Sequence, residues 1–336
     1  MQNKPSDVLY CGVRLKKIRE AKPTLDGTNL LYLYNFITRR YRIHLRKDVK
    51  HKPQPWTKDP VLQEFRFTNV RREHDRETKW LIKYITSNSE VSYDDKLMNC
   101  ILFRLFNKHE TSEIIHQPIK FSSRYDPESY RDAFEAVERA NKDYIFFTGA
   151  FITGGMKRAL KWYLPKGIEE DSMPMRVMKF MEYLYQDGVV DKIKSCRTQK
   201  AVYDLLRGYL GIGNFLAYQM FVDMTYIKEF PFSENEFTAA GPGCKMGLGF
   251  LFADKDGMTD EECLFWVRDN IGDAFISILG KPWDPYKLFS DLPEKDRCLN
   301  VMSLENCFCE LSKYIRAKTE TGRPRKKYKP TEEDLP

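Results

Sequence analysis

Several features of familiar protein classes are missing from this sequence. Its 336 residues contain no apolar run near the roughly 18 to 20 residues that cross a bilayer. Residues 1–10 lack the apolar stretch of a secretory signal. The phosphate-binding pattern G-x-x-x-x-G-K-[ST] does not occur, which argues against a P-loop kinase. We therefore expect a cytoplasmic protein with no membrane partner.

Cysteine and histidine are too sparse and scattered to form a recognisable framework. The eight cysteines show no spacing typical of a disulfide framework, so reduced thiols are expected. Cys307 and Cys309 form a C-x-C pair with Cys298 upstream, but no second pair and no suitably spaced histidine accompanies them. The sequence therefore predicts no metal site.

What is present is enough apolar surface for a core and a modest excess of positive charge. Hydrophobic residues make up 42% of the chain, and 55 basic against 48 acidic residues give a net charge of +7. Basic residues crowd residues 39–52 and 323–329. This distribution favours a polyanionic partner, although a basic run is also typical of a solvated face.

Helical periodicity dominates, so the expected fold class is mainly α. Asp59 before Pro60 is a helix start signal, and the side chains of Leu62, Phe65, Asn69 and Arg72 would share one side of the helix that follows. Further helices are expected at 128–141, 173–187, 198–209, 214–228, 260–278 and 303–316. The segments 117–121 and 143–151 are short enough for strands or buried turns. We expect an extension over 1–25, a helical domain over 26–317 and a basic, disordered tail over 318–336.

The most informative stretch runs from Tyr209 to Ala217 and reads YLGIGNFLA. Apolar-patterned helices enter and leave it, and Gly211 and Gly213 would let the backbone turn tightly and approach a ligand. The amides at the start of the second helix, at Asn214, could then meet a phosphate oxygen. The pattern resembles the helix-hairpin-helix element, within 200–228, that grips a DNA backbone phosphate. The alternative is an ordinary helical corner with a glycine cap.

A second glycine-rich stretch, Gly241 to Gly249, carries Lys245. As a loop, its backbone amides and Lys245 could face a phosphate or a flipped base. The alternative is a tight turn between helices.

Several separated motifs, taken in order, resemble one family. They are PWTKDP (55–60), FRFTNVRR with Asp75 (65–75), the hairpin with Gln219 and Asp223, GPG (241–243), and LENCFCE (304–310). Together, over roughly residues 29–316, they resemble the thymine-hypermodification family of bacteriophage DNA, the α-glutamyl/putrescinyl thymine pyrophosphorylases or amino acid:DNA transferases. That family shares its helical domain with 5-hydroxymethyluracil DNA kinases.

The resemblance implies a glycosylase-like helical fold and a reaction on double-stranded DNA in the cytoplasm of an infected bacterial host. A pathway kinase first pyrophosphorylates 5-hydroxymethyluracil, and the transferase then replaces pyrophosphate with an amino acid or polyamine. The base would be flipped out of the stack. Without a P-loop, the chain is expected to be the transferase and not the kinase.

Two other functions stay open. Glycosylases of the hairpin class carry a catalytic aspartate after the hairpin, whereas residues 230–236 read FPFSENE. This departure weakens base excision of a modified pyrimidine. A non-catalytic DNA-binding accessory protein is the remaining alternative.

The transfer chemistry suggests roles for individual residues. Arg72 is the first choice for holding pyrophosphate, and Arg71 and Lys245 are the next choices. Asn69 would orient the pyrimidine ring. Asp223, Glu236 or Glu305 would accept the proton of the incoming ammonium, with Asp223 the first choice, and Asp75 would hold Arg72 in place. For each carboxylate taken alone, a structural salt bridge is favoured over catalysis. The alternative for Arg72 is a surface pair with Asp75, and the alternative for Asn69 is a buried structural hydrogen bond.

Other contacts are expected with DNA. Gly211, Gly213, Asn214 and Gln219 would contact DNA. No cofactor is demanded, although Mg²⁺ would help to neutralise pyrophosphate. Arg323 and Arg325 flank Pro324 in a pattern that resembles a minor-groove AT-hook, for which a solubilising tail is the alternative.

Overall fold

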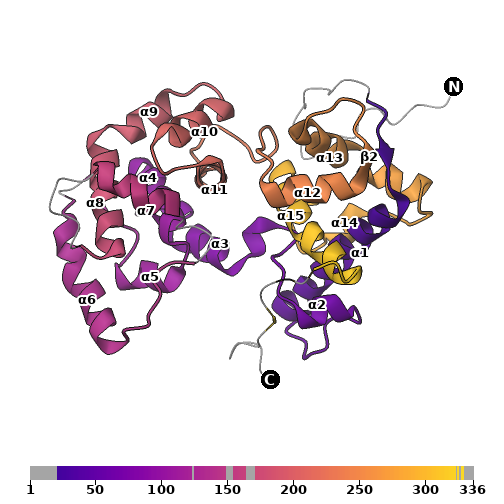
Figure 1. Ribbon diagram of the computed structural model, residues 1–336, viewed down its shortest axis with the longest axis horizontal. Coiled ribbons are helices and arrows are strands. Elements are labelled where there is room, and N and C mark those ends of the chain that lie inside the picture. The colour runs from indigo at the N-terminus through magenta and orange to yellow at the C-terminus, as the bar shows by residue number, and fades with distance from the viewer. Residues whose placement is uncertain are drawn as a thin grey trace. The chain divides into compact units, whose positions relative to one another are not determined.

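The computed structural model describes residues 21–122, 125–148, 154–163, 171–322, 324 and 327–328. These residues form helices joined by short connections, with one small sheet (Figure 1). The mainly α fold class is therefore confirmed. Among the described helices, none combines the length and apolar character required to span a bilayer.

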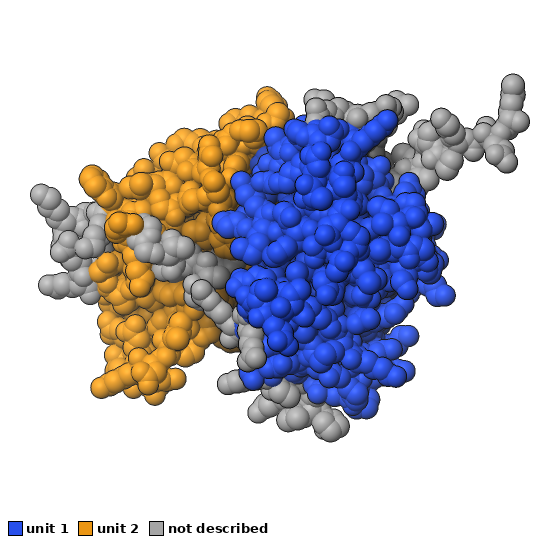
Figure 2. All heavy atoms as spheres, turned by 45° about the vertical axis from the view of Figure 1, so that its right-hand side comes forward, with its two compact units in different colours: residues 1–75, 235–336 blue, residues 76–234 orange. Residues whose placement is uncertain are grey.

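The chain divides into two compact units, coloured separately in Figure 2. Unit 1 contains residues 1–75 and 235–336, and unit 2 contains residues 76–234. The sequence motifs are thus shared between two units, each with its own core. The outer limits predicted for a single helical domain, 26 and 317, stay a prediction.

Unit 1 is built around its last helix. Its elements are β1 (Thr24–Leu25), α1 (Gly27–His44), η2 (Leu45–Val49), α2 (Pro60–Glu64), η3 (Arg72–His74), α12 (Pro242–Leu251), β2 (Phe252–Asp254), α13 (Asp260–Ser277), α14 (Pro285–Leu288), η7 (Glu294–Asp296) and α15 (Val301–Lys318). Helix α15 packs against α1, α2, α12, α13 and η3. Most of its side chains are buried, which explains why the apolar pattern of 303–316 is so dense.

Two glycines let α12 and α15 approach closely, and the two helices lie side by side in Figure 1. A Cβ atom at Gly243 would lie 2.6 Å from Cys309 Sγ, and one at Gly247 would collide with the Phe308 carbonyl oxygen. The prediction of a glycine-rich loop over 241–249 is therefore wrong, because Pro242–Leu251 is helical. The glycines serve helix packing, which outweighs their low helix propensity.

The strands lie where no strand was predicted. β1 pairs antiparallel with β2, and both predicted short segments, 117–121 and 143–148, are turns and irregular backbone as far as they are described. The two-stranded ladder joins the start of α1 to the end of α12. This pairing is reinforced by the Asp26 backbone N–H, which donates to the Leu251 carbonyl at 2.8 Å.

Unit 2 surrounds one helix that is buried along most of its length. Its elements are α3 (Arg76–Leu81), η4 (Ile82–Thr86), α4 (Tyr93–Phe106), α5 (His109–Ile114), η5 (Pro127–Tyr130), α6 (Arg131–Ala140), α7 (Gly154–Tyr163), α8 (Met173–Gln186), α9 (Val189–Ser195), α10 (Gln199–Gly208) and α11 (Asn214–Met224). Every side chain of α4 from Asp95 to Phe106 is buried. Helix α4 packs against α5, α8, α9 and α11.

The predicted start at Asp59 is confirmed, but the helix that follows is shorter than predicted. The Asp59 carboxylate accepts hydrogen bonds from the N–H groups of Val61 and Leu62, with Pro60 in the first turn. Helix α2 ends at Glu64, and Phe65 is extended. The prediction that Asn69 and Arg72 continue this helix is therefore wrong.

Part of the predicted disordered tail is placed against unit 1. Lys327 forms a β-bridge with Phe65, and the Tyr328 backbone N–H donates to the Glu64 carbonyl at 2.9 Å. Disorder of the tail over 318–336 stays a prediction, and Arg323 and Arg325 lie outside the described residues. Six described cysteines are free thiols, as expected, whereas Cys298 is disulfide-bonded.

Candidate active site

The candidate site begins in the irregular segment between α2 and η3, in unit 1. The backbone N–H of Asn69 donates to Asp75 Oδ1 at 2.7 Å, and Asn69 Nδ2 donates to the His74 carbonyl at 2.9 Å. Arg40, on α1, donates from Nε to the Phe67 carbonyl at 3.3 Å. These contacts hold the segment in an irregular course and bring Asn69 and Asp75 together.

Arg72 acts electrostatically on two carboxylates, one three residues away and one on α15. Its side chain is only 7% exposed, and its positive charge lowers the pKa of both Asp75 and Glu305. Glu305, on α15, also accepts a hydrogen bond from the backbone N–H of Gly241 at 3.3 Å. The structure thus brings together four of the predicted site residues, Asn69, Arg72, Asp75 and Glu305.

Loss of hydration gives both carboxyl groups unusual proton affinities. Desolvation raises the pKa of Asp75 to about 6, against the hydrogen bond from Asn69 and the charges of Arg40 and Arg72, which lower it. Desolvation also raises the pKa of Glu305, against the charge of Arg72 and the Gly241 hydrogen bond. A carboxyl group that titrates near 6 can accept and release a proton close to neutral pH.

The Asn69 side chain offers a buried acceptor. The residue is 9% exposed, and no described residue donates a hydrogen bond to its Oδ1 atom. The preceding segment is fixed from α15, since Asn306 Nδ2 donates to Thr68 Oγ1 at 3.0 Å and to the Asn69 carbonyl at 3.2 Å. Buried acceptors are normally satisfied, so Asn69 Oδ1 is a candidate contact for a ligand donor.

Three other predicted residues of unit 1 lie in different environments. Arg71 is 3% exposed and donates to the Cys298 carbonyl at 2.5 Å and to Glu73 Oε1 at 2.6 Å, which favours a structural role. Lys245 is exposed on α12, with Nζ 3.6 Å from Asp260 Oδ2. Glu236 is exposed ahead of α12. Their roles in binding or catalysis stay predictions.

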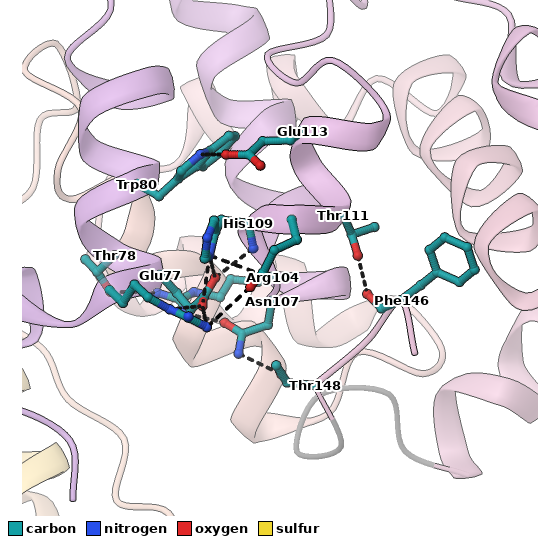
Figure 3. A network of polar contacts seen from close by, with 12 residues as sticks. Glu77, Thr78, Trp80, Arg104, Asn107, His109, Thr111, Glu113, Phe146 and Thr148 are labelled. Carbon is teal, nitrogen blue, oxygen red and sulfur yellow. Dashed lines mark hydrogen bonds and ion pairs between the residues drawn. The ribbon is translucent and has the colours of Figure 1, made fainter. Parts of the chain in front are cut away.

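Asp223 belongs to unit 2 and forms a buried ion pair. Its two carboxylate oxygens accept from Arg104 Nε at 2.5 Å and Nη2 at 2.6 Å, and the Asp223 side chain is fully buried. Arg104 also donates to Asn107 Oδ1, and Asn107 donates to Thr148 Oγ1 (Figure 3). This network favours the structural salt bridge that the sequence left open for Asp223, and a role as base stays a prediction.

The hairpin lies between the two helices expected there. Helix α10 ends at Gly208 and α11 begins at Asn214, after a turn in which Gly211 has φ +91°. A Cβ atom at Gly211 would lie 2.5 Å from the Ala159 Cβ on α7, so this glycine meets both a backbone and a packing requirement. Gly213 and Asn214 are exposed, whereas Gln219 is 5% exposed within the core. Phosphate binding by the hairpin stays a prediction.

Sequence reasoning missed Arg40, Asn306 and Arg104. The sequence could have indicated the role of Arg104, since it is the only charged residue in the largely apolar run of 97–106. A buried cation requires a carboxylate partner. The roles of Arg40 and Asn306 had no such signal, because both depend on contacts between α1 or α15 and the segment before η3.

Comparison with known proteins places the chain in a family. A family model described as the helical domain of 5-hmdU DNA kinase matches residues 28–323. A 5-hmdU DNA kinase of Bacillus phage SP10 is 27% identical over 345 residues, which cover 97% of this chain and 51% of that relative. The chain therefore spans about half the length of this relative. No solved structure matches the chain.

The matched region includes Asn69, Arg72, Asp75, the hairpin and Glu305. It confirms the resemblance drawn from the ordered motifs, including the link to the helical domain of the kinases. The chain belongs to the family of the helical domain of 5-hmdU DNA kinases.

Proposed function

We propose that the chain is a DNA-modifying transferase of a phage thymine-hypermodification pathway. It acts on 5-hydroxymethyluracil in DNA that a kinase has pyrophosphorylated, and replaces pyrophosphate with an amino acid or polyamine. Family membership supports a place in the metabolism of this base. The observation that carries the proposal is that the buried Arg72 guanidinium acts electrostatically on both Asp75 and Glu305, while Asp75 accepts a hydrogen bond from the Asn69 backbone N–H.

Each part of the cluster matches a need of the reaction. The C–O bond between the base methylene and pyrophosphate breaks, and the nitrogen of the incoming amine forms a C–N bond to that carbon. Arg72 stabilises the departing pyrophosphate through charge-assisted hydrogen bonds. Asn69 Oδ1 accepts a hydrogen bond from the N3–H of the pyrimidine and orients the ring.

The nitrogen nucleophile must lose a proton to become neutral. Asp75, with a pKa of about 6, accepts that proton at neutral pH and releases it to solvent. Glu305, which is also desolvated, is the second acceptor. The proposed base therefore moves from Asp223, which is paired with Arg104, to Asp75.

A second function is favoured by the coverage of the match. The relative is named as a kinase, and this chain corresponds to about half of it. The helical region could therefore recognise the modified base for a kinase activity that resides elsewhere. This alternative predicts binding to 5-hydroxymethyluracil DNA without release of pyrophosphate by the chain itself.

Pyrophosphate release distinguishes the two functions. The chain is mixed with a duplex that carries pyrophosphorylated 5-hydroxymethyluracil and with a pool of amino acids and polyamines, and free pyrophosphate is measured. We expect donor-dependent release that Arg72→Lys reduces at least about 100-fold, because lysine cannot reproduce the bidentate contact. Arg66→Lys, an exposed arginine of the same segment, is the matched control and should retain activity. Tight binding without pyrophosphate release would support the recognition function.

A further inference from the structure

We propose that residues 42–58 of unit 1, the basic segment, bind the phosphate backbone of duplex DNA. The segment comprises the end of α1, η2 and the connection to α2. Six of its 17 residues are lysine or arginine and only one, Asp48, is acidic, so it carries +5 of the chain's net charge of +7. The choice of DNA as the polyanion rests on the proposed function, whereas the basic surface itself does not.

Most of this positive charge is not balanced within the described part of the protein. Four side chains of the basic segment are exposed and form no ion pair or hydrogen bond with a described residue: those of Arg42, Lys50, Lys52 and Lys58. The acidic residue of the segment is engaged, since Asp48 Oδ2 lies 2.8 Å from His44 Nδ1. Neighbouring like charges repel one another and lower the stability of the fold. An anionic partner would relieve this repulsion.

Internal contacts organise the backbone that carries these cations. The backbone N–H of Lys52 donates to the Arg46 carbonyl at 2.8 Å, which folds the connection back onto η2. Trp56 is 8% exposed, its Nε1 donates to the Lys52 carbonyl at 2.6 Å, and its own carbonyl accepts from Arg46 Nη1 at 2.5 Å. Lys47 Nζ lies over the Trp56 ring, 5.3 Å from its centroid. The segment is therefore folded before DNA binds, which reduces the entropy lost on binding.

A second basic stretch of the sequence meets the basic segment. Tyr328 packs edge-on against Trp56, with ring centroids 5.9 Å apart, and Lys47 Nζ lies 5.6 Å from the centroid of the Tyr328 ring. Lys327 is exposed beside Tyr328, with Nζ 3.2 Å from Glu64 Oε1. Segments from opposite ends of the sequence thus contribute cations to one surface of unit 1.

The aromatic content of the basic segment favours duplex over single-stranded DNA. Proteins that bind single strands present aromatic rings on which the bases stack. In residues 42–58 Trp56 is the only Trp, Tyr or Phe, and its ring packs against Lys47 and Tyr328. The exposed cations therefore suit phosphates, which supply salt-dependent affinity for a duplex and carry no sequence information. Binding at this surface should not depend on whether the bases are modified.

Duplex binding by a charge-neutralised variant tests the surface without catalysis. Fluorescence anisotropy of the full chain with an unmodified, labelled duplex gives Kd from about 50 to about 200 mM salt. Lys50→Gln, Lys52→Gln and Lys58→Gln, combined in one triple variant, should weaken binding at least about tenfold. The slope of log Kd against log salt should fall by about 2 to 3, since each phosphate contact contributes about 0.9.

The matched control removes the same charge elsewhere. It combines Lys120→Gln, Lys142→Gln and Lys281→Gln, three exposed lysines outside the basic segment whose side chains form no ion pair with a described residue. This control should bind the duplex almost as tightly as wild type, and both triple variants should keep the wild-type melting temperature.

A measurement on the wild type does not depend on the folding of any variant. Lysines are acetylated with an amine-reactive reagent, with and without the duplex, and the modified positions are identified by mass spectrometry. The duplex should protect Lys50, Lys52 and Lys58 from acetylation and leave Lys120 and Lys142 reactive.

Four results would overturn the proposal. They are wild-type affinity and salt dependence in the variant of the basic segment, equal weakening by the two triple variants, acetylation of the three segment lysines that the duplex leaves unchanged, or tighter binding of the wild type to a single strand than to a duplex of the same length. Duplex binding through these lysines without pyrophosphate release would contradict the proposed function and leave the DNA-binding surface standing. Transfer activity in a chain whose basic segment does not bind the duplex would overturn only the surface.

Discussion

The carboxylate of Asp75 accepts a hydrogen bond from the backbone N–H of Asn69, 2.7 Å away, across a segment that contains Arg72. Together with the Asn69 Nδ2 bond to the His74 carbonyl and the Arg40 bond to the Phe67 carbonyl, it holds the segment that carries Arg72, whose charge also acts on Glu305 of α15. In the proposed function these groups are the acceptor for the ring, the cation for pyrophosphate and the base.

Asp75→Asn should abolish transfer and stabilise the fold at neutral pH. The raised pKa of Asp75 means that the folded state holds a proton more tightly than the unfolded state, so stability falls as pH rises from about 4 through about 6. Asparagine keeps an acceptor for the Asn69 N–H without the buried charge. Urea unfolding should show Asp75→Asn more stable than wild type by about 1–2 kcal/mol at pH 8, with little difference at pH 4.

The same pKa predicts the pH dependence of the reaction. If Asp75 is the base, wild-type kcat/KM should rise with pH through about 6 and then level off. A profile without an inflection near pH 6, or Asp75→Asn with wild-type activity, would exclude Asp75 as the base. The pH profile of kcat/KM for Glu305→Gln provides the comparison, since this variant removes the second proposed proton acceptor.

Gly247→Ala should destabilise the chain by about 2–3 kcal/mol, because the added methyl would collide with the Phe308 backbone carbonyl on α15. Gly249→Ala in the same helix is the matched control, since nothing lies within 4 Å of a Cβ atom there. It should leave stability unchanged or raise it by up to about 1 kcal/mol. Equal effects of the two changes in urea unfolding would contradict the close packing of α12 on α15.

Arg104→Met should cost about 3–5 kcal/mol of stability, because it leaves the buried Asp223 carboxylate without its guanidinium. Lys200→Met breaks the exposed ion pair with Asp204 and should cost less than about 1 kcal/mol. Thermal unfolding of both variants measures the difference. If Arg104→Met instead folds as stably as wild type and loses only activity, Asp223 and Arg104 belong to the catalytic machinery.

Gly213→Ala tests phosphate binding by the hairpin. Gly213 has φ −77° and nothing within 4 Å of a Cβ atom, so alanine should fold normally. If a DNA phosphate contacts the amides beside Gly213, the added methyl should weaken DNA binding by about tenfold, the equivalent of one lost charge-assisted bond. Fluorescence anisotropy with a labelled duplex measures this. Unchanged affinity would favour the alternative of an ordinary helical corner.

Local signals in the sequence predicted the helix start at Asp59 and the turn between α10 and α11. Asp59 caps its helix as expected, because N-cap bonds form within three residues. The grouping of Asn69, Arg72, Asp75 and Glu305 came from the ordered motifs of a family resemblance. No spacing rule could place residue 305 near residue 72.

Features that depend on long-range contacts were not predicted. The spacing of Leu62, Phe65, Asn69 and Arg72 fits a helical face, yet the helix ends at Glu64, because Phe65 pairs with Lys327 and Arg40 binds the Phe67 carbonyl. Composition likewise suggested a loop over 241–249, since only the packing on α15 explains those glycines.

The most direct test of the central claim is mass spectrometry of nucleosides digested from reacted DNA. The substrate is 5-hydroxymethyluracil duplex treated with a pyrophosphorylating kinase, incubated with this chain and a pool of amino acids and polyamines. The account predicts a new nucleoside, heavier than thymidine by the attached donor, that forms with wild type and not with Arg72→Lys. DNA that returns only its original nucleosides under these conditions, or that loses the base, would contradict it.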